Sequence, residues 1–107
     1  MVDNKRLCGL IGLAMKAGKL VAGTDACLEQ MEKKTVKIIL VAQDASERTK
    51  TKFEQEAKKC NIPIYKVLSI DEISKAMGKN NKAVIGIKEA GFSNKIMDII
   101  RGGEQIG

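Results

Sequence analysis

The chain has no histidine and no tryptophan, and only three aromatic side chains among its 107 residues. Histidine is the side chain that most readily exchanges protons near neutral pH, so its absence disfavours general acid–base catalysis. Tyr65, Phe53 and Phe92 are too few to stack successive bases of a single strand, and Phe53 falls on the buried face of an expected helix. The sequence thus predicts a protein that is not an enzyme and has no stacking surface for single-stranded nucleic acid.

Cysteine and long apolar runs are also scarce. Cys8, Cys27 and Cys60 are odd in number, widely spaced and without a CxxC pair, which argues against a disulfide framework and a zinc site and predicts small buried side chains in a reducing compartment. No apolar run approaches the roughly 20 residues of a membrane span, and the first residues begin an amphipathic segment instead of a signal sequence. We therefore expect a cytoplasmic protein with no metal, no cofactor and no membrane partner.

Positive charge is the main excess in the composition. Nineteen Lys and Arg residues against thirteen Asp and Glu residues leave a net charge of +6. This balance favours a polyanionic partner, although a solubilising excess of lysine is the alternative. Because 107 residues with 44% hydrophobic content suffice for one core, we expect residues 1–107 to form a single domain, with a monomer favoured.

The spacing of apolar residues predicts helices alternating with strands. The expected helices cover residues 4–17, 23–34, 46–60, 69–77 and 93–101, and the expected strands cover residues 20–22, 37–42, 63–67 and 83–87. Gly9 and Gly12 inside the first helix predict close approach of another element, Gly18 ends that helix, and residues 102–107 are expected to fray. The pattern predicts an α/β fold, a three-layer α/β/α sandwich around a four-stranded mixed sheet.

Three loops of such a sheet should meet at one end and form a site: Gly23–Asp25, Asp44–Ser46 and Gly78–Lys82. Lys16 and Lys19 stand beside a turn whose backbone amides could face an anion. The glycine spacing there is not that of a P-loop, because five residues separate Gly12 from Gly18 and no Ser or Thr follows the lysine. A nucleoside triphosphate site is therefore disfavoured.

The basic residues around these loops predict contacts with the phosphates of a shaped RNA. Any one lysine could belong to a solvated rim, but several together favour a binding surface. The candidate RNA-binding residues are Lys16, Lys19, Gly23, Thr24, Asp25, Lys33, Lys79, Asn80, Asn81, Lys82 and Ala83.

Several segments, in the same order along the chain, resemble those of a known protein family. They are Gly12–Lys19 with Gly23, Ile39–Ser46, Ile62-Pro63, Gly78–Ile87, and Gly91–Lys95. The chain resembles, from about Leu10 to Lys95, the kink-turn-binding ribosomal proteins of the L-seven-Ae and L-thirty-e type, most closely their small bacterial YlxQ-like branch. The resemblance implies the three-layer fold and binding to sharply bent, internally looped RNA in a ribosomal or RNA-processing setting, with ribosomal RNA as one candidate partner.

The resemblance also identifies departures. Relatives that bind kink-turns tightly carry a Gly-Thr-Asn-Glu-x-Thr-Lys type motif at the start of the second helix, where Asn and Glu read sheared G·A pairs and Lys meets the backbone. This chain keeps Gly23 and Thr24 but has Asp25, Ala26 and Glu29 in the other three places. The comparison therefore favours general binding of structured RNA over kink-turn specificity.

Those departures leave a second hypothesis open, a protein-interaction module that keeps the fold and has lost specific RNA reading. Its partner would bind an exposed apolar patch on the terminal helix, with Ile96, Ile99 and Ile100 as candidates. A third possibility is an accessory domain of an RNA-modifying enzyme, which would need a catalytic partner chain.

Overall fold

A computed structural model describes residues 3–102 of the chain as helices and strands in alternation. The elements are, in order, α1 (Asn4–Lys16), β1 (Leu20–Ala22), α2 (Thr24–Glu32), β2 (Ile38–Val41), α3 (Glu47–Cys60), β3 (Ile64–Lys66), α4 (Ile70–Met77), β4 (Val84–Ile87) and α5 (Ala90–Gly102). All nine elements expected from the sequence are present.

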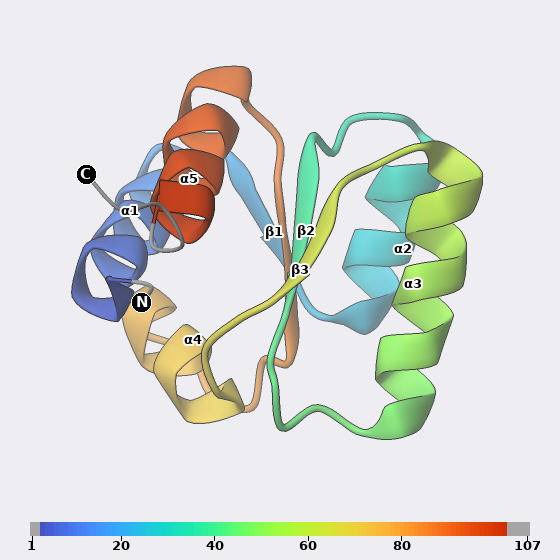
Figure 1. Ribbon diagram of the computed structural model, residues 1–107, viewed down its shortest axis with the longest axis horizontal. Coiled ribbons are helices and arrows are strands. Elements are labelled where there is room, and N and C mark those ends of the chain that lie inside the picture. Colours follow the sequence, from blue (N-terminus) through green and yellow to red (C-terminus); the bar gives the residue numbers. More distant parts are fainter. Residues whose placement is uncertain (1–2, 103–107) are drawn as a thin grey trace.

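The four strands form one mixed sheet in the order β1-β4-β2-β3. β4 runs antiparallel to both β1 and β2, whereas β2 and β3 are parallel. Helices α1, α4 and α5 cover one face of the sheet and α2 and α3 cover the other (Figure 1). The expected three-layer sandwich with a four-stranded mixed sheet is confirmed.

The core lies on both faces of the sheet. All four residues of β2 and all four of β4 are buried, which explains why these strands read as continuous apolar runs instead of alternating patterns. Side chains from both helical layers complete the packing. The largest fully buried side chains of the helices are Leu7, Ile11, Met31, Phe53, Ile73 and Ile96.

Side-chain caps fix where most helices begin. The side chains of Asp3, Ser46 and Ser69 accept hydrogen bonds from the first turns of α1, α3 and α4, respectively. The start of α5 was predicted wrongly at residue 93, because the carboxylate of Glu89 accepts a hydrogen bond from the Phe92 N–H at 2.7 Å. This contact lets the helix begin at residue 90.

Two glycines of α1 have different surroundings. A Cβ on Gly12 would lie 3.1 Å from the carbonyl oxygen of Ala76, so α4 does approach there. A Cβ on Gly9 would meet nothing within 4 Å, so that prediction was wrong. Helix α2 ends at residue 32 instead of 34 because Lys34 adopts a left-handed φ of 61°. Gly102 belongs to α5, and the rest of the expected frayed tail lies outside the described residues.

The three cysteines differ in burial. Cys27 is buried, whereas Cys8 and Cys60 are only partly buried, and all three are free thiols. The expectation of three buried cysteines therefore holds for one of them. Within residues 3–102, no helix is long and apolar enough to cross a membrane.

Candidate nucleic-acid interface

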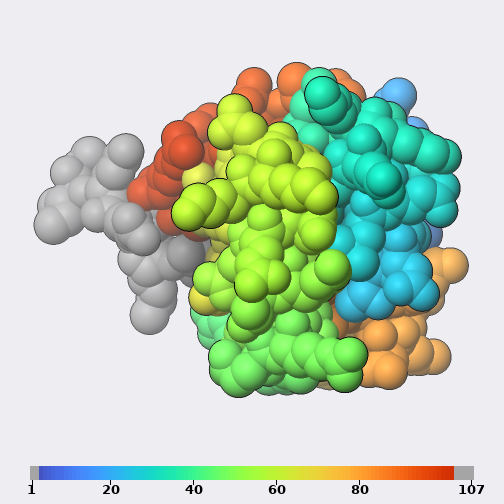
Figure 2. Space-filling model, turned by 90° about the vertical axis from the view of Figure 1, so that its right-hand side faces the viewer, coloured from blue at the N-terminus to red at the C-terminus, as the bar shows by residue number. Residues whose placement is uncertain are grey.

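Two ends of the sheet carry different loops. At one end of the sheet β1 and β2 finish and β4 begins. We call this end the loop edge; its loops are residues 23–25, 42–46 and 79–83. The Gly23 N–H donates to the Val84 carbonyl at 2.9 Å and the Ala42 N–H donates to the Ala83 carbonyl at 2.8 Å. Figure 2 shows the light-blue start of α2, the green start of α3 and the light-orange segment before β4 next to one another at the bottom of the molecule. The three expected loops do converge.

The first turn of α2 differs from those of the other helices. Its N-cap is Gly23, which has no side chain to accept a hydrogen bond, and none is made there within the described residues. Gly23 adopts φ 99° and ψ 154°, a conformation that is almost restricted to glycine. The open N–H groups of this turn carry the positive end of the helix dipole. Open N–H groups at a helix start can bind an oxyanion, and here the carboxylate of Asp25 lies in the same turn.

Lys82 is the cation beside this turn. Its Nζ lies 3.7 Å from the position that a Cβ would take on Gly23. Its backbone N–H donates to the Oγ of the buried Ser74 at 2.8 Å, which holds the segment before β4 against α4. Burial raises the pKa of Cys27, which follows in α2, to about 12, and the nearby Lys82 charge opposes that rise. The Lys82 side chain is thus near both the buried thiol and the open helix end.

The segment from Lys79 to Asn81 stands next to Lys82 on the surface. All three residues are exposed, and Asn81 adopts a left-handed φ of 53°. The Lys79 N–H donates to the Ser74 carbonyl at 2.9 Å. Asn80 and Asn81 line a shallow hollow with Asp44 and Ser74. Two cations and two amides therefore stand together at the loop edge.

Carboxylates at the loop edge are mostly engaged by the protein itself. Asp44 accepts a hydrogen bond from the Ile70 N–H at 2.8 Å, and Asp71 lies 3.1 Å from the Lys75 ammonium. Among the described residues, neither Lys79 nor Lys82 has a carboxylate within 4.0 Å. These two lysines remain available for phosphates.

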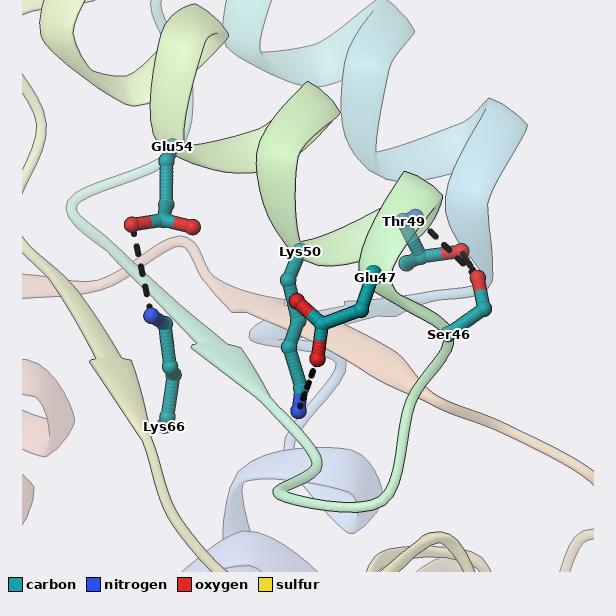
Figure 3. A network of polar contacts seen from close by, with 6 residues as sticks. All are labelled: Ser46, Glu47, Thr49, Lys50, Glu54 and Lys66. Carbon is teal, nitrogen blue, oxygen red and sulfur yellow. Dashed lines mark hydrogen bonds and ion pairs between the residues drawn. The ribbon is translucent and has the colours of Figure 1, made fainter.

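The start of α3 holds a further polar network (Figure 3). The Ser46 Oγ accepts from the Thr49 N–H at 3.1 Å, while Lys50 lies 3.5 Å from Glu47. Lys66 at the end of β3 lies 3.3 Å from Glu54. Both lysines of this network already have carboxylate partners, and the Ser46 cap stabilises the start of α3.

The structure does not bring Lys16, Lys19 and Lys33 to the loop edge. Lys16 ends α1 and Lys19 precedes β1, so they lie at the opposite end of the sheet from Gly23. Lys33 follows α2 at that same end and forms an ion pair with Glu29 at 3.1 Å. The expected junction of Lys19 with the open amides is therefore wrong, because β1 separates them and Lys82 takes the place beside the helix.

Two features of this site were not predicted from the sequence. Ser74 is a polar residue within α4 whose role depends on contact with a residue eight positions later, and no local pattern indicates that contact. A groove between α2 and α3 opens beside Thr24 and is lined by Leu28, Arg48 and Phe53 among others. No pattern in the sequence indicates that α2 packs against α3, so this groove was not predicted.

Comparisons with known proteins identify the family of the chain. The model of the ribosomal protein L7Ae/L30e/S12e/Gadd45 family matches residues 5–97. The chain is 37% identical over 100 residues to RNA-binding protein YlxQ of Enterococcus faecium, covering 94% of this chain and 96% of that one. It is 30% identical over 91 residues to RNA-binding protein YlxQ of Bacillus subtilis (strain 168), covering 85% and 91%.

Solved structures show the same fold. A protein of unknown function from Bacillus halodurans C superposes with a TM-score of 0.85 at 30% identity, covering 89% of this chain and 96% of that one. The Giardia lamblia 15.5kD RNA binding protein superposes with a TM-score of 0.75 at 16% identity, covering 92% and 84%. The order of elements, the convergence of loops at one sheet end and the match over residues 5–97 lead to one conclusion: the chain belongs to the ribosomal protein L7Ae/L30e/S12e/Gadd45 family.

Proposed function

We propose that the protein binds structured RNA through the loop edge and catalyses no reaction. The observation that carries this proposal is the open first turn of α2 with the Lys82 ammonium against Gly23. Backbone N–H groups and a lysine at one point suit a phosphate oxygen. Two relatives with substantial identity are named RNA-binding proteins, which supports the same ligand.

The RNA that fits best has an irregular, exposed backbone. The loop edge combines cations from the segment before β4 with amides from Asn80 and Asn81, and it presents no aromatic side chain on these loops. A surface of this kind binds by shape and phosphate contacts. We therefore propose an internally looped RNA, with kink-turn and ribosomal RNA elements as the first ones to test, and the cytoplasm as the compartment.

We do not propose that this protein recognises kink-turn bases through the side chains that its relatives use. Asp25, Ala26 and Glu29 are all exposed on the first two turns of α2, where relatives place the base-reading and backbone-contacting side chains. Glu29 is held by Lys33 at 3.1 Å, so the charge at this point is an internal ion pair. We therefore propose that the backbone N–H groups at the start of α2 bind phosphate, and that its side chains contribute little to base recognition.

The apolar surface that the protein-interaction hypothesis requires on α5 is not exposed. Ile96, Ile99 and Ile100 are buried, with exposed fractions of 0%, 7% and 6%, because α5 turns these residues toward α1 and the sheet. The expected exposed patch on the terminal helix is therefore wrong. Leu13 is the large apolar side chain that is exposed among the described residues, and one residue does not make a docking patch.

Titration with RNA over a salt series tests the proposal. We expect wild-type protein to bind an RNA hairpin with an internal loop, with the logarithm of the binding constant falling linearly with the logarithm of salt concentration. Lys82→Ala should reduce the slope by about 0.7 to 1, because one phosphate contact is lost. Lys58→Ala, an exposed lysine at the other end of α3, is the matched control. Absence of binding at low salt, or binding without salt dependence, would reject the proposal.

A further inference from the structure

One exposed carboxylate at the loop edge stands where its charge disfavours RNA. Asp44 lines the same shallow hollow as Lys79, Asn80 and Asn81. Among residues 3–102, no lysine or arginine forms an ion pair with it within 4.0 Å. A negative charge close to bound phosphates repels them. The place of Asp44 in this surface therefore has to be explained by something other than its charge.

The Asp44 side chain is bound to the start of α4. Its Oδ1 accepts a hydrogen bond from the Ile70 N–H at 2.8 Å. Ile70 is the first residue of α4, where the backbone N–H groups have no acceptor within the helix. The neighbouring Gln43 N–H donates to the Leu68 carbonyl at 2.8 Å. Two adjacent residues of the loop after β2 thus hold the segment that leads into α4.

The other contacts of α4 act on different parts of the helix. The Ser69 Oγ accepts from the Glu72 N–H at 3.0 Å, and the Glu72 carboxylate accepts from the Ser69 N–H at 2.9 Å. These bonds lie within the first turn, so they order the turn without joining it to another element. Packing against α1 acts near the end of α4, where the Ala76 carbonyl approaches Gly12. Asp44 joins the first turn to a residue 26 positions earlier in the chain.

Helix α4 also holds the segment that carries Lys82. The Ser74 Oγ accepts from the Lys82 N–H at 2.8 Å, and the Ser74 carbonyl accepts from the Lys79 N–H at 2.9 Å. The Lys82 Nζ in turn lies 3.7 Å from the position of a Cβ on Gly23. A path of short contacts therefore runs from Asp44 through α4 to the start of α2. A helix moves as a rigid element, so a shift of its first turn is carried along this path.

We propose that Asp44 is a positioning residue of the loop-edge RNA site, which holds α4 so that Lys82 stays beside the open first turn of α2. Asp44 acts through Lys82 and does not itself bind RNA. This inference rests on the proposed function, because it takes Lys82 as a phosphate contact. The hydrogen bond of Asp44 favours RNA binding and its charge opposes it, so substitutions can separate the two effects.

The test measures binding of an RNA hairpin with an internal loop over a salt series. Asp44→Ala removes the charge and the hydrogen bond, whereas Asp44→Asn removes the charge and keeps an oxygen that accepts from the Ile70 N–H. The control Asp71→Ala removes a carboxylate of the same helix turn that pairs with Lys75 at 3.1 Å. We expect Asp44→Ala to bind about three- to tenfold more weakly at low salt, with a salt slope smaller by up to about 1, because the Lys82 contact is lost. Asp44→Asn and Asp71→Ala should bind as tightly as wild type or more tightly.

The Lys82→Ala background shows whether Asp44 acts through Lys82. Residues that act through one contact have non-additive effects, so Asp44→Ala should cause no further loss of affinity in Lys82→Ala protein. In the free protein, the backbone amide signals of Ser74 and Lys82 should shift in Asp44→Ala and much less in Asp44→Asn.

The direction of the Asp44→Ala effect decides the inference. Binding equal to or tighter than wild type would mean that only the charge acts, and the inference would be overturned. Additive losses in the Lys82→Ala background, or an Asp44→Asn variant as weak as Asp44→Ala, would also overturn it and leave the proposed function intact. Thermal unfolding follows each variant, and an Asp44→Ala chain that is unfolded at the binding temperature would show a role in general stability instead. Wild-type protein that does not bind the hairpin would reject the proposed function and this inference with it.

Discussion

Gly23 and Lys82 meet at the loop edge, although they are far apart in the chain: the Lys82 Nζ lies 3.7 Å from where a Cβ of Gly23 would stand. This contact exists because β1 and β4 pair in an antiparallel manner, which puts the end of one beside the beginning of the other. It joins an open helix N-terminus to a lysine without an ion-pair partner in the described residues. The proposed RNA site depends on this pair.

Replacement of Gly23 by alanine should destabilise the protein and weaken RNA binding. The Gly23 φ of 99° is unfavourable for a residue with a Cβ, so we expect a loss of about 1–3 kcal/mol in the free energy of unfolding. The matched control is Gly9→Ala, within α1, where a Cβ meets nothing within 4 Å. That change should stabilise the protein by up to about 1 kcal/mol. Urea unfolding of both variants checks the prediction, and equal effects would contradict it.

Ser74 should stabilise the segment before β4 through its hydroxyl. Ser74→Ala leaves the Lys82 N–H without the acceptor that it now has at 2.8 Å, so we expect a loss of about 1–3 kcal/mol and weaker RNA binding. Ser93 offers the comparison, because its Oγ is buried with no hydrogen-bond partner in the described residues. Ser93→Ala should be neutral or stabilising. Chemical unfolding with binding titrations measures both; unchanged RNA affinity in Ser74→Ala would contradict the proposed role.

Burial of Cys27 should make stability depend on alkaline pH. The folded-state pKa is raised from 9.0 to about 12, so above pH 9 the unfolded chain loses the thiol proton while the folded chain keeps it. Stability therefore falls as pH rises between about 9 and 12, by about 1 kcal/mol from pH 9 to pH 10. Urea unfolding at several pH values should show this loss in wild type and less of it in Cys27→Ala. Parallel pH profiles would show that the thiol does not cause the dependence.

One variant can restore the kink-turn-binding motif of relatives at the three α2 positions where this chain differs from it. Asp25→Asn/Ala26→Glu/Glu29→Lys restores the side chains that the family resemblance implies for kink-turn reading, and all three positions are exposed. We expect tighter binding and a larger preference for a kink-turn over a plain duplex. The single change Glu29→Lys should tighten binding to both RNAs, because it adds only charge. A folded triple variant that binds no better than wild type would mean that the loop edge is not the RNA site.

Much of the fold follows from local signals in the sequence. The continuous apolar run of β2 predicts its burial, and the capping box of Ser69 with Glu72 predicts the start of α4. The convergence of three loops follows from the alternation of strands and helices. In each of these cases the determining interactions are close in sequence or are imposed by the sheet as a whole.

The placement of individual lysines does not follow from the sequence. Lys19 is close to Gly23 in the chain, but β1 spans the residues between them in an extended conformation, so the two residues lie at opposite ends of a strand. Lys82 is distant from Gly23 in sequence and adjacent in space. Similarly, the prediction that Ile96 and Ile99 are exposed is wrong because the face that α5 buries depends on its packing against α1. Such contacts are tertiary, and no local pattern encodes them.

The most direct test of the proposed loop-edge site is an NMR titration of the uniformly labelled protein with an internally looped RNA hairpin, following backbone amide shifts. We expect the largest changes on residues 23–25 and 79–83, with the Gly23, Thr24 and Lys82 amides among them, and we expect these changes to diminish in Lys82→Ala. Changes confined to α1 and α5, or no changes at RNA concentrations that saturate binding in low salt, would contradict the assignment of the loop edge as the RNA-binding surface.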